Sequence, residues 1–415
     1  MTLPPSVIFP VIPQIQVTLN CNLACTYCFQ QRFPAMIKPA TVATILHKAV
    51  EHNRRLGCLA PGQKMPVYWH GGEPLLAGLD FFKQVMAIEA GFTDVTFENR
   101  IQTNATLMTE EFARFFAEHN FAVGFSLDGP EDIHNRHRRR ATGGGSFDAT
   151  MRGIELYRHH AKPGRLPIIA VITRDSIGRA PDLYNFFKAM EGMVQLDIYD
   201  LRSFDLPLTE KGEPGWELAP SSKEVGNFLI ELFDLWFYDP SRRVDFKELR
   251  QEVKMILQPE QQGGDPFHKR RCDIRRTIFD PQGRVFSCDQ YVNDDRTMLG
   301  RIQHDSLTAM MKKKLLLWEE IKRTIRHRTK DMACNACEWG RQCIGGCLSC
   351  MKYNALLLRA RAEGQVADGQ WPEIELPDSL AAIAGETYYC DGLRRFRDHV
   401  KKAVQHELSS EPKSA

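Results

Sequence analysis

The alternation of two kinds of segment along the first half of the chain strongly limits its fold. Six short apolar runs have the character of β-strands, and five amphipathic runs with helical periodicity lie between them. The strand-like runs are residues 15–20, 66–70, 99–104, 122–128, 167–173 and 194–201. The helical runs are residues 40–57, 79–91, 109–120, 146–160 and 180–193. Strict β/α alternation predicts a parallel sheet covered by helices, and six units are too few to close an eight-stranded barrel. We therefore expect an α/β fold, an open partial (β/α)6 barrel of the TIM-like kind.

Local patterns support the helical assignments and divide the chain in two. The apolar residues Val42, Ile45, Leu46 and Val50 recur with the spacing of one helical face. Ser146 precedes the run 147–157 and is predicted to be its N-cap. Residues 205–222 form a Pro/Gly-rich loop, and an apolar helix is expected over 224–239. Beyond it the chain is rich in cysteine, which indicates a small domain organised by metal rather than by a large core.

Composition and charge narrow the class of protein. The 415 residues carry a formal net charge of +2, which argues neither for nor against nucleic acid. The densest basic run, residues 134–140, is expected to be a solvated face or a local anion site, because no basic and aromatic residues extend it into a nucleic-acid patch. The chain shows no signal peptide and no apolar run of the ~18 residues that a membrane span needs. A cytoplasmic location is expected, where twelve cysteines favour metal or redox chemistry over disulfides.

Three of these cysteines lie within eight residues, in the sequence CNLACTYC. Cys21, Cys25 and Cys28 follow the first predicted strand, at the end of the sheet that carries active sites in barrels of this type. Structural zinc sites and [4Fe–4S] clusters normally have four protein ligands. Three thiolates would leave one metal position open to chemistry. The glycine pair of GGEP, residues 71–74, follows the second strand and reaches the same end.

The spacing C-x3-C-x2-C, followed by Phe29 and by GGEP after the second strand, resembles the radical S-adenosylmethionine (SAM) enzymes. The resemblance implies that Cys21, Cys25 and Cys28 hold a [4Fe–4S] cluster whose fourth iron is chelated by SAM. The reduced cluster then cleaves SAM to a 5′-deoxyadenosyl radical that abstracts a hydrogen atom. By the same resemblance, backbone groups of Gly71, Gly72 and Glu73 would meet the SAM amino group. Ser126 and Asn104 would approach its ribose and carboxylate.

A second cysteine array lies in the C-terminal half. Its members are Cys272, Cys288, Cys334, Cys337, Cys343, Cys347 and Cys390. A zinc ribbon is one interpretation of the C-x2-C pair, but seven cysteines exceed one tetrahedral site.

The spacing resembles the SPASM extension of radical SAM enzymes that modify peptides and proteins, which implies two auxiliary [4Fe–4S] clusters. The first would be held by Cys272, Cys288 and Cys347. The second would be held by Cys334, Cys337, Cys343 and Cys390. Cys350 or His268 could complete the first, and Cys58 lies outside the pattern. The implied domains are a core over residues 1–225, a helical linker over 226–271, a SPASM domain over 272–400 and a polar tail over 401–415.

Several further stretches are similar to the anaerobic sulfatase-maturating enzymes, which oxidise a Cys or Ser side chain of a sulfatase to formylglycine. They include HGGEPLLAGLDFF, IQTNAT, VGFSLDGP, SCDQYV and LGRI. The resemblance implies that Asp289, directly after Cys288, is the catalytic base, although a structural role in a turn is the alternative. Two departures are His70, where these enzymes typically have Gln, and the lack of a cysteine shortly before Cys272.

The resemblance therefore implies a protein or peptide substrate, either a sulfatase or a ribosomal peptide precursor that receives a cross-link. The implied electron donor is a flavodoxin- or ferredoxin-like protein, and neither nucleic acid nor a membrane is expected as a partner. Two other classes stay open at this point. One is a radical SAM dehydrogenase of a small molecule, and the other is a non-catalytic iron–sulfur or zinc module.

Overall fold

The computed structural model describes most of the N-terminal half and parts of the C-terminal half. The described residues are 9–30, 32–199, 218–258, 275–289, 292, 297–316, 337–339 and 389–410. The chain divides into two compact units, which we describe separately. The first unit comprises Met1–Leu127, His134–Gly164 and Asp273–Glu320, and the second comprises Asp128–Ile133, Arg165–Cys272 and Ile321–Ala415.

The first unit is built on a mainly parallel sheet. Its strands are β1 (Ile12–Thr18), β2 (Lys64–Gly71), β3 (Thr96–Thr103), β4 (Ala122–Ser126), β8 (Arg276–Phe279), β9 (Arg284–Phe286) and β10 (Met298–Arg301). They are ordered β10-β9-β8-β1-β2-β3-β4. Strands β1 to β4 pair in parallel with their neighbours, and β8 adds to the free side of β1, also in parallel. The short strands β9 and β10 continue the sheet as antiparallel neighbours.

Apolar and polar side chains alternate along β1, so the two faces of the sheet differ in polarity. Ile15 and Val17 point to one face and Gln14 and Gln16 to the other, and all four side chains are buried. A strand covered on both faces is what a parallel sheet between layers requires. The register places Tyr68 of β2 beside Gln14 and His70 beside Gln16. One face of this sheet is therefore apolar, and the other is lined by polar side chains.

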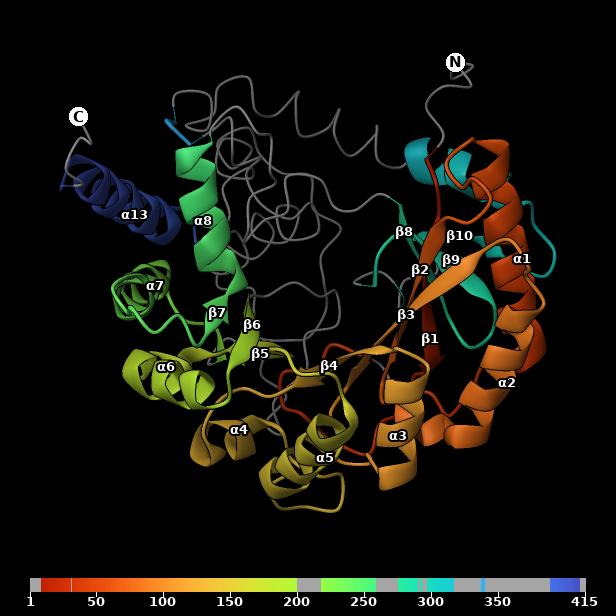
Figure 1. Cartoon of the computed structure of the whole chain (residues 1–415), viewed down its shortest axis with the longest axis horizontal. Coiled ribbons are helices and arrows are strands. Elements are labelled where there is room, and N and C mark those ends of the chain that lie inside the picture. The colour runs from red at the N-terminus through yellow and green to blue at the C-terminus, as the bar shows by residue number, and fades with distance from the viewer. Residues whose placement is uncertain are drawn as a thin grey trace, which may run out of the picture. The chain divides into compact units, whose positions relative to one another are not determined.

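Helices cover the apolar face. They are α1 (Pro39–Arg55), α2 (Leu79–Ala90), α3 (Glu110–Glu118) and α5 (Phe147–His160). In Figure 1, α1 and α2 lie together on one side of strands β1 to β3. Phe82 of α2 is fully buried and meets Phe81, Phe116 and Trp69 in edge-to-face contacts with ring centroids 5.2–6.1 Å apart.

The prediction that Ser146 is the N-cap of α5 is confirmed in position, but not with the side-chain contact that is usual there. Ser146 occupies the N-cap position, but its side chain makes no capping hydrogen bond. Its Oγ instead donates to the Arg138 carbonyl oxygen at 2.7 Å and lies 3.0 Å from His134 Nε2. Both partners belong to the basic run 134–140. The Ser146 hydroxyl therefore makes tertiary contacts with this run instead of a hydrogen bond to the first turn of α5. His134 lies in α4 (Glu131–His137), a short helix that the sequence pattern did not indicate.

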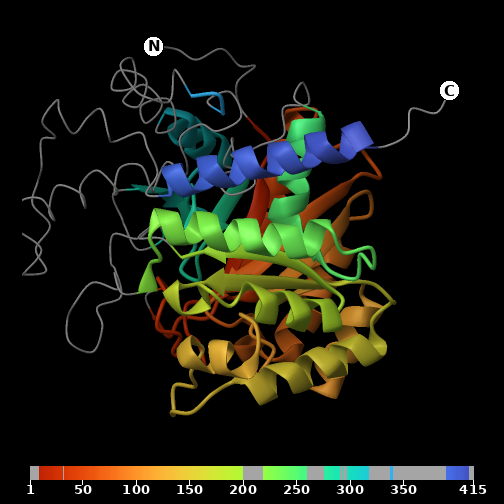
Figure 2. The same cartoon turned by 90° about the vertical axis from the view of Figure 1, so that its left-hand side faces the viewer.

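The second unit contains the remaining β/α elements. Its strands are β5 (Leu166–Ile172), β6 (Gly192–Ile198) and β7 (Asp245–Phe246), and its helices are α6 (Ala180–Ala189), α7 (Ser222–Phe237), α8 (Lys247–Leu257) and α13 (Cys390–Ser410). The strands pair in parallel in the order β5-β6-β7. Helix α13, blue in Figure 2, lies along α7, in green.

Two glycines allow α7 and α13 to approach closely. A Cβ added to Gly226 of α7 would lie 2.8 Å from the backbone of Gly392 in α13. A Cβ added to Gly392 would lie 1.9 Å from the Ser222 carbonyl oxygen. The Gly392 N–H also donates to Ser222 Oγ at 2.9 Å. The start of α13 is thus fixed directly on the first turns of α7.

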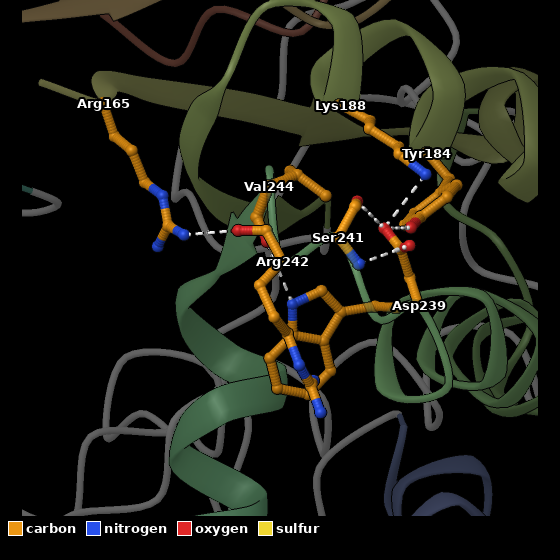
Figure 3. Close-up of polar contacts among 8 residues, drawn as sticks. Arg165, Tyr184, Lys188, Asp239, Ser241, Arg242 and Val244 are labelled. Atoms are coloured by element: carbon orange, nitrogen blue, oxygen red, sulfur yellow. Dashed lines mark hydrogen bonds and ion pairs between the residues drawn. The ribbon is translucent and has the colours of Figure 1, made fainter.

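The turn after α7 is held by a single carboxylate (Figure 3). Asp239 accepts hydrogen bonds from the Ser241 hydroxyl at 2.6 Å and from the Tyr184 hydroxyl, and Lys188 Nζ lies 3.0 Å away. These contacts, the hydrogen bonds from Ser241 first among them, lower the pKa of Asp239 far below its ordinary value. The carboxylate therefore joins the α7–β7 turn to α6 throughout the neutral pH range.

The predicted β/α alternation is confirmed, with strand and helix ends shifted by a few residues. The predicted helix 224–239 corresponds to α7, and the loop predicted over 205–222 lies mostly outside the described residues. Helix α13 continues to Ser410, so the segment predicted as a tail begins inside a helix. No helix among the described residues is long and apolar enough to cross a membrane.

Candidate active site

The cysteine loop begins where β1 ends. Cys21 and Cys25 are half-buried and Cys28 is exposed. The Cys28 N–H donates to the Cys25 carbonyl oxygen at 3.1 Å, which closes a tight turn. Cys21 Sγ accepts hydrogen bonds from the Leu23 N–H at 3.4 Å and from Asn104 Nδ2 at 3.8 Å. The loop therefore presents three thiols in a folded backbone that already supplies N–H donors to sulfur.

Three thiols are the type of ligand that iron–sulfur clusters take. No three His, Cys, Asp or Glu side chains of the described residues converge as ligands of one metal ion would. A cubane cluster does not require that convergence, because each thiolate binds a different iron. Burial raises the pKa of the Cys21 thiol, and the nearby Glu73 and Cys28 add to this effect, whereas the Leu23 N–H and Arg32 oppose it. Bound metal would overcome this shift, since coordinating thiols lose their proton.

The GGEP turn after β2 packs directly on the end of β1. Gly71 has a φ of +124°, and an added Cβ would lie 2.2 Å from the Thr18 carbonyl oxygen. At Gly72 the corresponding distance to the Asn20 carbonyl oxygen is 2.1 Å. The Gly72 and Glu73 N–H groups donate to these two carbonyls at 2.8 and 3.0 Å. Both positions therefore require glycine, and the turn has little N–H capacity left. Its carbonyl oxygens have the polarity that binds an ammonium group.

The Glu73 side chain has a structural role that the sequence did not reveal. It is fully buried and accepts from Leu75 N–H at 3.0 Å, Thr103 Oγ1 at 2.7 Å and Asn104 N–H at 2.8 Å. Burial raises the pKa of Glu73 to about 7, although the three hydrogen bonds oppose the shift. The carboxyl group thereby joins the ends of β2 and β3 beneath the cysteine loop.

Asn104 and Ser126 lie at the ends of β3 and β4, as their motifs predicted. The Asn104 side chain contacts Cys21 Sγ and donates to Asn22 Oδ1 at 3.0 Å. Ser126 Oγ accepts from Gln102 Nε2 at 3.0 Å. Asn104 therefore supports the cysteine loop directly, whereas Ser126 belongs to the polar face of the sheet.

Asp289 lies against the same polar face. The Gln14 amide donates to its Oδ2 at 3.4 Å, and the thiol of Cys288 donates to its Oδ1 at 3.3 Å. Strand β8 causes this proximity, because its parallel pairing with β1 brings the β8–β9 hairpin, and Cys288 and Asp289 after it, beside Gln14. The structure thus brings Asp289 into the unit that holds Cys21, Cys25 and Cys28.

Unsatisfied polar atoms concentrate around this face. Within the described part of the chain, eight buried side-chain nitrogen or oxygen atoms have no hydrogen-bond partner. Five of the eight are Gln16 Oε1, Gln30 Nε2, His70 Nδ1, Arg276 Nε and Ser287 Oγ. Unmet polar groups are costly when buried, so a concentration of them marks a place where a polar ligand is accommodated.

His70 is the most informative member of this group. Burial lowers the pKa of His70; the nearby Asp289 raises it and Arg276 lowers it further. The imidazole is therefore neutral at neutral pH and offers one donor and one acceptor nitrogen. Sequence analysis singled out His70 but missed Gln14 and Gln16. Two polar residues spaced two apart in the otherwise apolar strand IPQIQV could have revealed the polar face.

The auxiliary cysteines are only partly described. Cys288 lies in the first unit, and Cys337 and Cys390 lie in the second. Cys390 opens α13, and segment 337–339 is attached to that helix, because Trp339 Nε1 donates to Asp398 Oδ1 at 3.0 Å. The cysteines Cys272, Cys334, Cys343 and Cys347, and the alternative ligands Cys350 and His268, lie outside the described residues. Cys58 is exposed and far along the chain from these segments.

We compared the sequence and the structure with those of known proteins. Residues 15–187 match the Radical SAM superfamily, a span that includes the cysteine loop, the GGEP turn and strands β1 to β5. Residues 15–187 therefore form a radical SAM domain. The resemblance read from CNLACTYC and GGEP is therefore confirmed, together with an α/β fold built on a parallel sheet.

Similarity extends beyond that core. The cysteine-type anaerobic sulfatase-maturating enzyme of Clostridium perfringens is 28% identical over 336 residues, which cover 80% of this chain and 86% of that protein. The serine-type enzyme of Klebsiella aerogenes is 28% identical over 332 residues, covering 79% and 76% of the two chains. A solved structure of native anSMEcpe with bound AdoMet and the Cp18Cys peptide superimposes with a TM-score of 0.72 at 25% identity. It covers 96% of this chain and 99% of that one.

Proposed function

We propose that this radical SAM protein oxidises a Cys or Ser side chain of a sulfatase to formylglycine. The observation that carries the proposal is the position of Asp289. It lies beside a polar face that starts at the cysteine loop, in a chain similar over most of its length to both cysteine-type and serine-type maturating enzymes. A small-molecule dehydrogenase and a non-catalytic module are not favoured, because neither accounts for this similarity.

Residues of the first unit would hold the cofactor. Cys21, Cys25 and Cys28 supply three thiolates, and the carbonyl oxygens of the Gly71–Glu73 turn receive the amino group of SAM. Asn104 keeps the loop in place through its contact with Cys21. When bound, the cluster and SAM supply a radical that removes one hydrogen atom from the substrate, and the auxiliary clusters accept an electron. We propose Cys272, Cys288 and Cys347 for one auxiliary cluster, and Cys334, Cys337, Cys343 and Cys390 for the other.

The polar face would hold the target side chain and receive its proton. After a hydrogen atom has left Cβ, the thiol or hydroxyl still carries a proton, and we propose Asp289 as the carboxylate that accepts it. Loss of that proton and of one electron completes a two-electron oxidation. A serine then yields the aldehyde directly. A cysteine yields a thioaldehyde, which water converts to the aldehyde with release of hydrogen sulfide.

The proposal is tested with the anaerobically reconstituted enzyme and sulfatase-derived peptides that carry Cys, Ser or Ala at the target position. We expect an aldehyde on the Cys or Ser peptide, measured by mass spectrometry, and none on the Ala peptide. Asp289→Asn should lower aldehyde formation about 100-fold or more while deoxyadenosine release falls less. The matched control is Asp305→Asn, because Asp305 accepts from the Arg301 N–H in a turn after β10. Parallel losses of both products in Asp289→Asn would instead assign Asp289 a structural role.

A further inference from the structure

The basic run 134–140, which the proposed chemistry does not use, is fastened to the cysteine loop. The contact has the form of a short antiparallel pairing, with Leu23 opposite Arg140. Its backbone hydrogen bonds run from Ala24 N to Arg139 O at 2.6 Å, from Thr26 N to His137 O at 3.1 Å and from Ala141 N to Asn22 O at 3.2 Å. The hydroxyl of Thr26 also lies 2.7 Å from His137 Nδ1. The arginines of this run are thus fixed beside the loop that carries Cys21, Cys25 and Cys28.

The two segments that make this contact are rich in positive charge, although Glu131 and Asp132 begin the helix that carries Arg136. Residues 20–38 and 134–147 together contain six Lys and Arg side chains and no Asp or Glu, although the whole chain is nearly balanced at 54 to 52. The six are Arg32, Lys38, Arg136, Arg138, Arg139 and Arg140. All except Arg138 are exposed. We call the exposed side chains of Arg32, Arg136, Arg139 and Arg140 the basic face.

Several cations of this surface are available to a partner. Arg32, Arg139 and Arg140 form no ion pair with any carboxylate in the described part of the chain. The Arg32 guanidinium donates to the Leu23 carbonyl oxygen, opposite Arg140, so these cations border the same short stretch of loop. Cys28 is exposed, and Phe33, which directly follows Arg32 in the sequence, is 46% exposed. An exposed aromatic ring among cations is typical of a protein interface, where an apolar centre has a charged rim.

We propose that the basic face is the docking site of an acidic one-electron donor protein. The inference rests on the proposed function, because SAM cleavage begins only after an electron from outside the protein has reduced the cluster, even if the electron later released by the substrate returns to it. That electron must reach the loop that holds Cys21, Cys25 and Cys28, and the basic face borders this loop. Complementary charge steers a partner to such a surface and accelerates encounter by factors of 10–1,000 at low salt. Small, charged and transient interfaces are usual between redox partners.

The test uses the reconstituted holoenzyme and a reduced flavodoxin, an acidic flavin protein, as the probe. One variant combines Arg139→Gln with Arg140→Gln, and the other is Arg140→Glu alone. The Arg140 side chain makes no hydrogen bond in the described part of the structure. The matched control is Arg114→Gln with Arg158→Gln, which removes two exposed charges from α3 and α5. Flavodoxin binding is measured by biolayer interferometry, and the rate of cluster bleaching by stopped-flow absorbance, each at two salt concentrations.

We expect the basic-face variants to bind flavodoxin about tenfold more slowly than the wild type does, and flavodoxin to reduce them about tenfold more slowly. Both rates should depend less on salt than those of the wild type, whereas the control should behave as the wild type. Their iron content and dithionite-driven SAM cleavage should stay unchanged. Equal flavodoxin binding and reduction in all proteins would overturn the proposal. A matching loss of dithionite-driven cleavage in the variants would also overturn it, because that loss would indicate a structural role. If the variants lost only the binding of an added oligonucleotide, the basic face would be a nucleic-acid site and the proposal would be wrong. If the wild type did not cleave SAM with dithionite, the proposed function would be contradicted. The docking proposal would still be tested, because flavodoxin binding is measured separately.

Discussion

His70 shows how a single side chain connects the fold to the proposed chemistry. It follows from strand register that His70 stands beside Gln16, and His70 Nδ1 and Gln16 Oε1 are both buried without a hydrogen-bond partner. The neutral ring can pair with a thiol, a hydroxyl or a backbone amide of a bound peptide. A polar atom that only the substrate satisfies contributes to binding and positioning rather than to folding.

We therefore expect His70→Phe to raise the KM for a target peptide about tenfold, while SAM cleavage without peptide changes little. One hydrogen bond of about 1–1.5 kcal/mol corresponds to a factor of that size. His70→Gln, which keeps a donor and an acceptor, should recover most of the loss. His47→Phe on α1, an exposed position, is the control. Equal KM values for the Phe and Gln variants would show that shape rather than polarity matters at this position.

Glu89 on α2 links stability to pH. It accepts a hydrogen bond from Asn99 Nδ2 at 2.8 Å, and burial raises its pKa from 4.5 to about 7. Because the folded-state pKa is the higher one, ionisation costs folding free energy as pH rises from about 4.5 to 7. In Glu89→Gln we expect a smaller decrease in urea stability across this window, by up to about 3 kcal/mol. An exposed carboxylate changed in the same way, Glu118→Gln, should keep the wild-type slope. Identical slopes for wild type and Glu89→Gln would disprove burial as the source of the shift.

The elements of the β/α core could be predicted because their patterns are local. Periodicity predicted the six strands β1 to β6 and the helices between them except α4, and the glycine and cysteine motifs predicted the end of the sheet that carries the site. Strands β8, β9 and β10 could not be found in this way. They are three or four residues long, and only pairing defines them. Strand β8 pairs with β1, which lies more than 250 residues earlier in the chain, β9 pairs with β8, and β10 pairs with β9. The position of Asp289 beside Gln14 depends on that pairing.

The contact between α7 and α13 gives a test at the scale of elements. Gly226→Ala would place a methyl group against the Gly392 backbone, where 2.8 Å is available. We expect a net loss of roughly 1–3 kcal/mol from overpacking, in spite of the better helix propensity of Ala. Urea unfolding followed by circular dichroism measures it. Lys223→Ala, exposed on the same helix, adds no contact and serves as the control. A stabilised Gly226→Ala would mean that the two helices can separate without cost.

At the scale of the whole molecule, the cysteines divide into two functional groups. The loop cysteines are predicted to serve SAM cleavage, and the C-terminal array to hold separate clusters. The triple variant Cys21→Ala, Cys25→Ala and Cys28→Ala should therefore lose SAM cleavage and retain about eight of about twelve irons, with four per cluster. Iron and sulfide analysis after anaerobic reconstitution measures the change. An unchanged iron content would place no cluster at the loop.

The central claim is that the enzyme takes a hydrogen atom from Cβ of a polypeptide side chain. The most direct measurement uses a sulfatase-derived peptide with deuterium at Cβ of its target cysteine, incubated with holoenzyme, SAM and dithionite. Mass spectrometry of the 5′-deoxyadenosine then reports where its added hydrogen came from. The account predicts deuterium in deoxyadenosine together with aldehyde in the peptide. Unlabelled deoxyadenosine from a peptide that is nevertheless converted would contradict it.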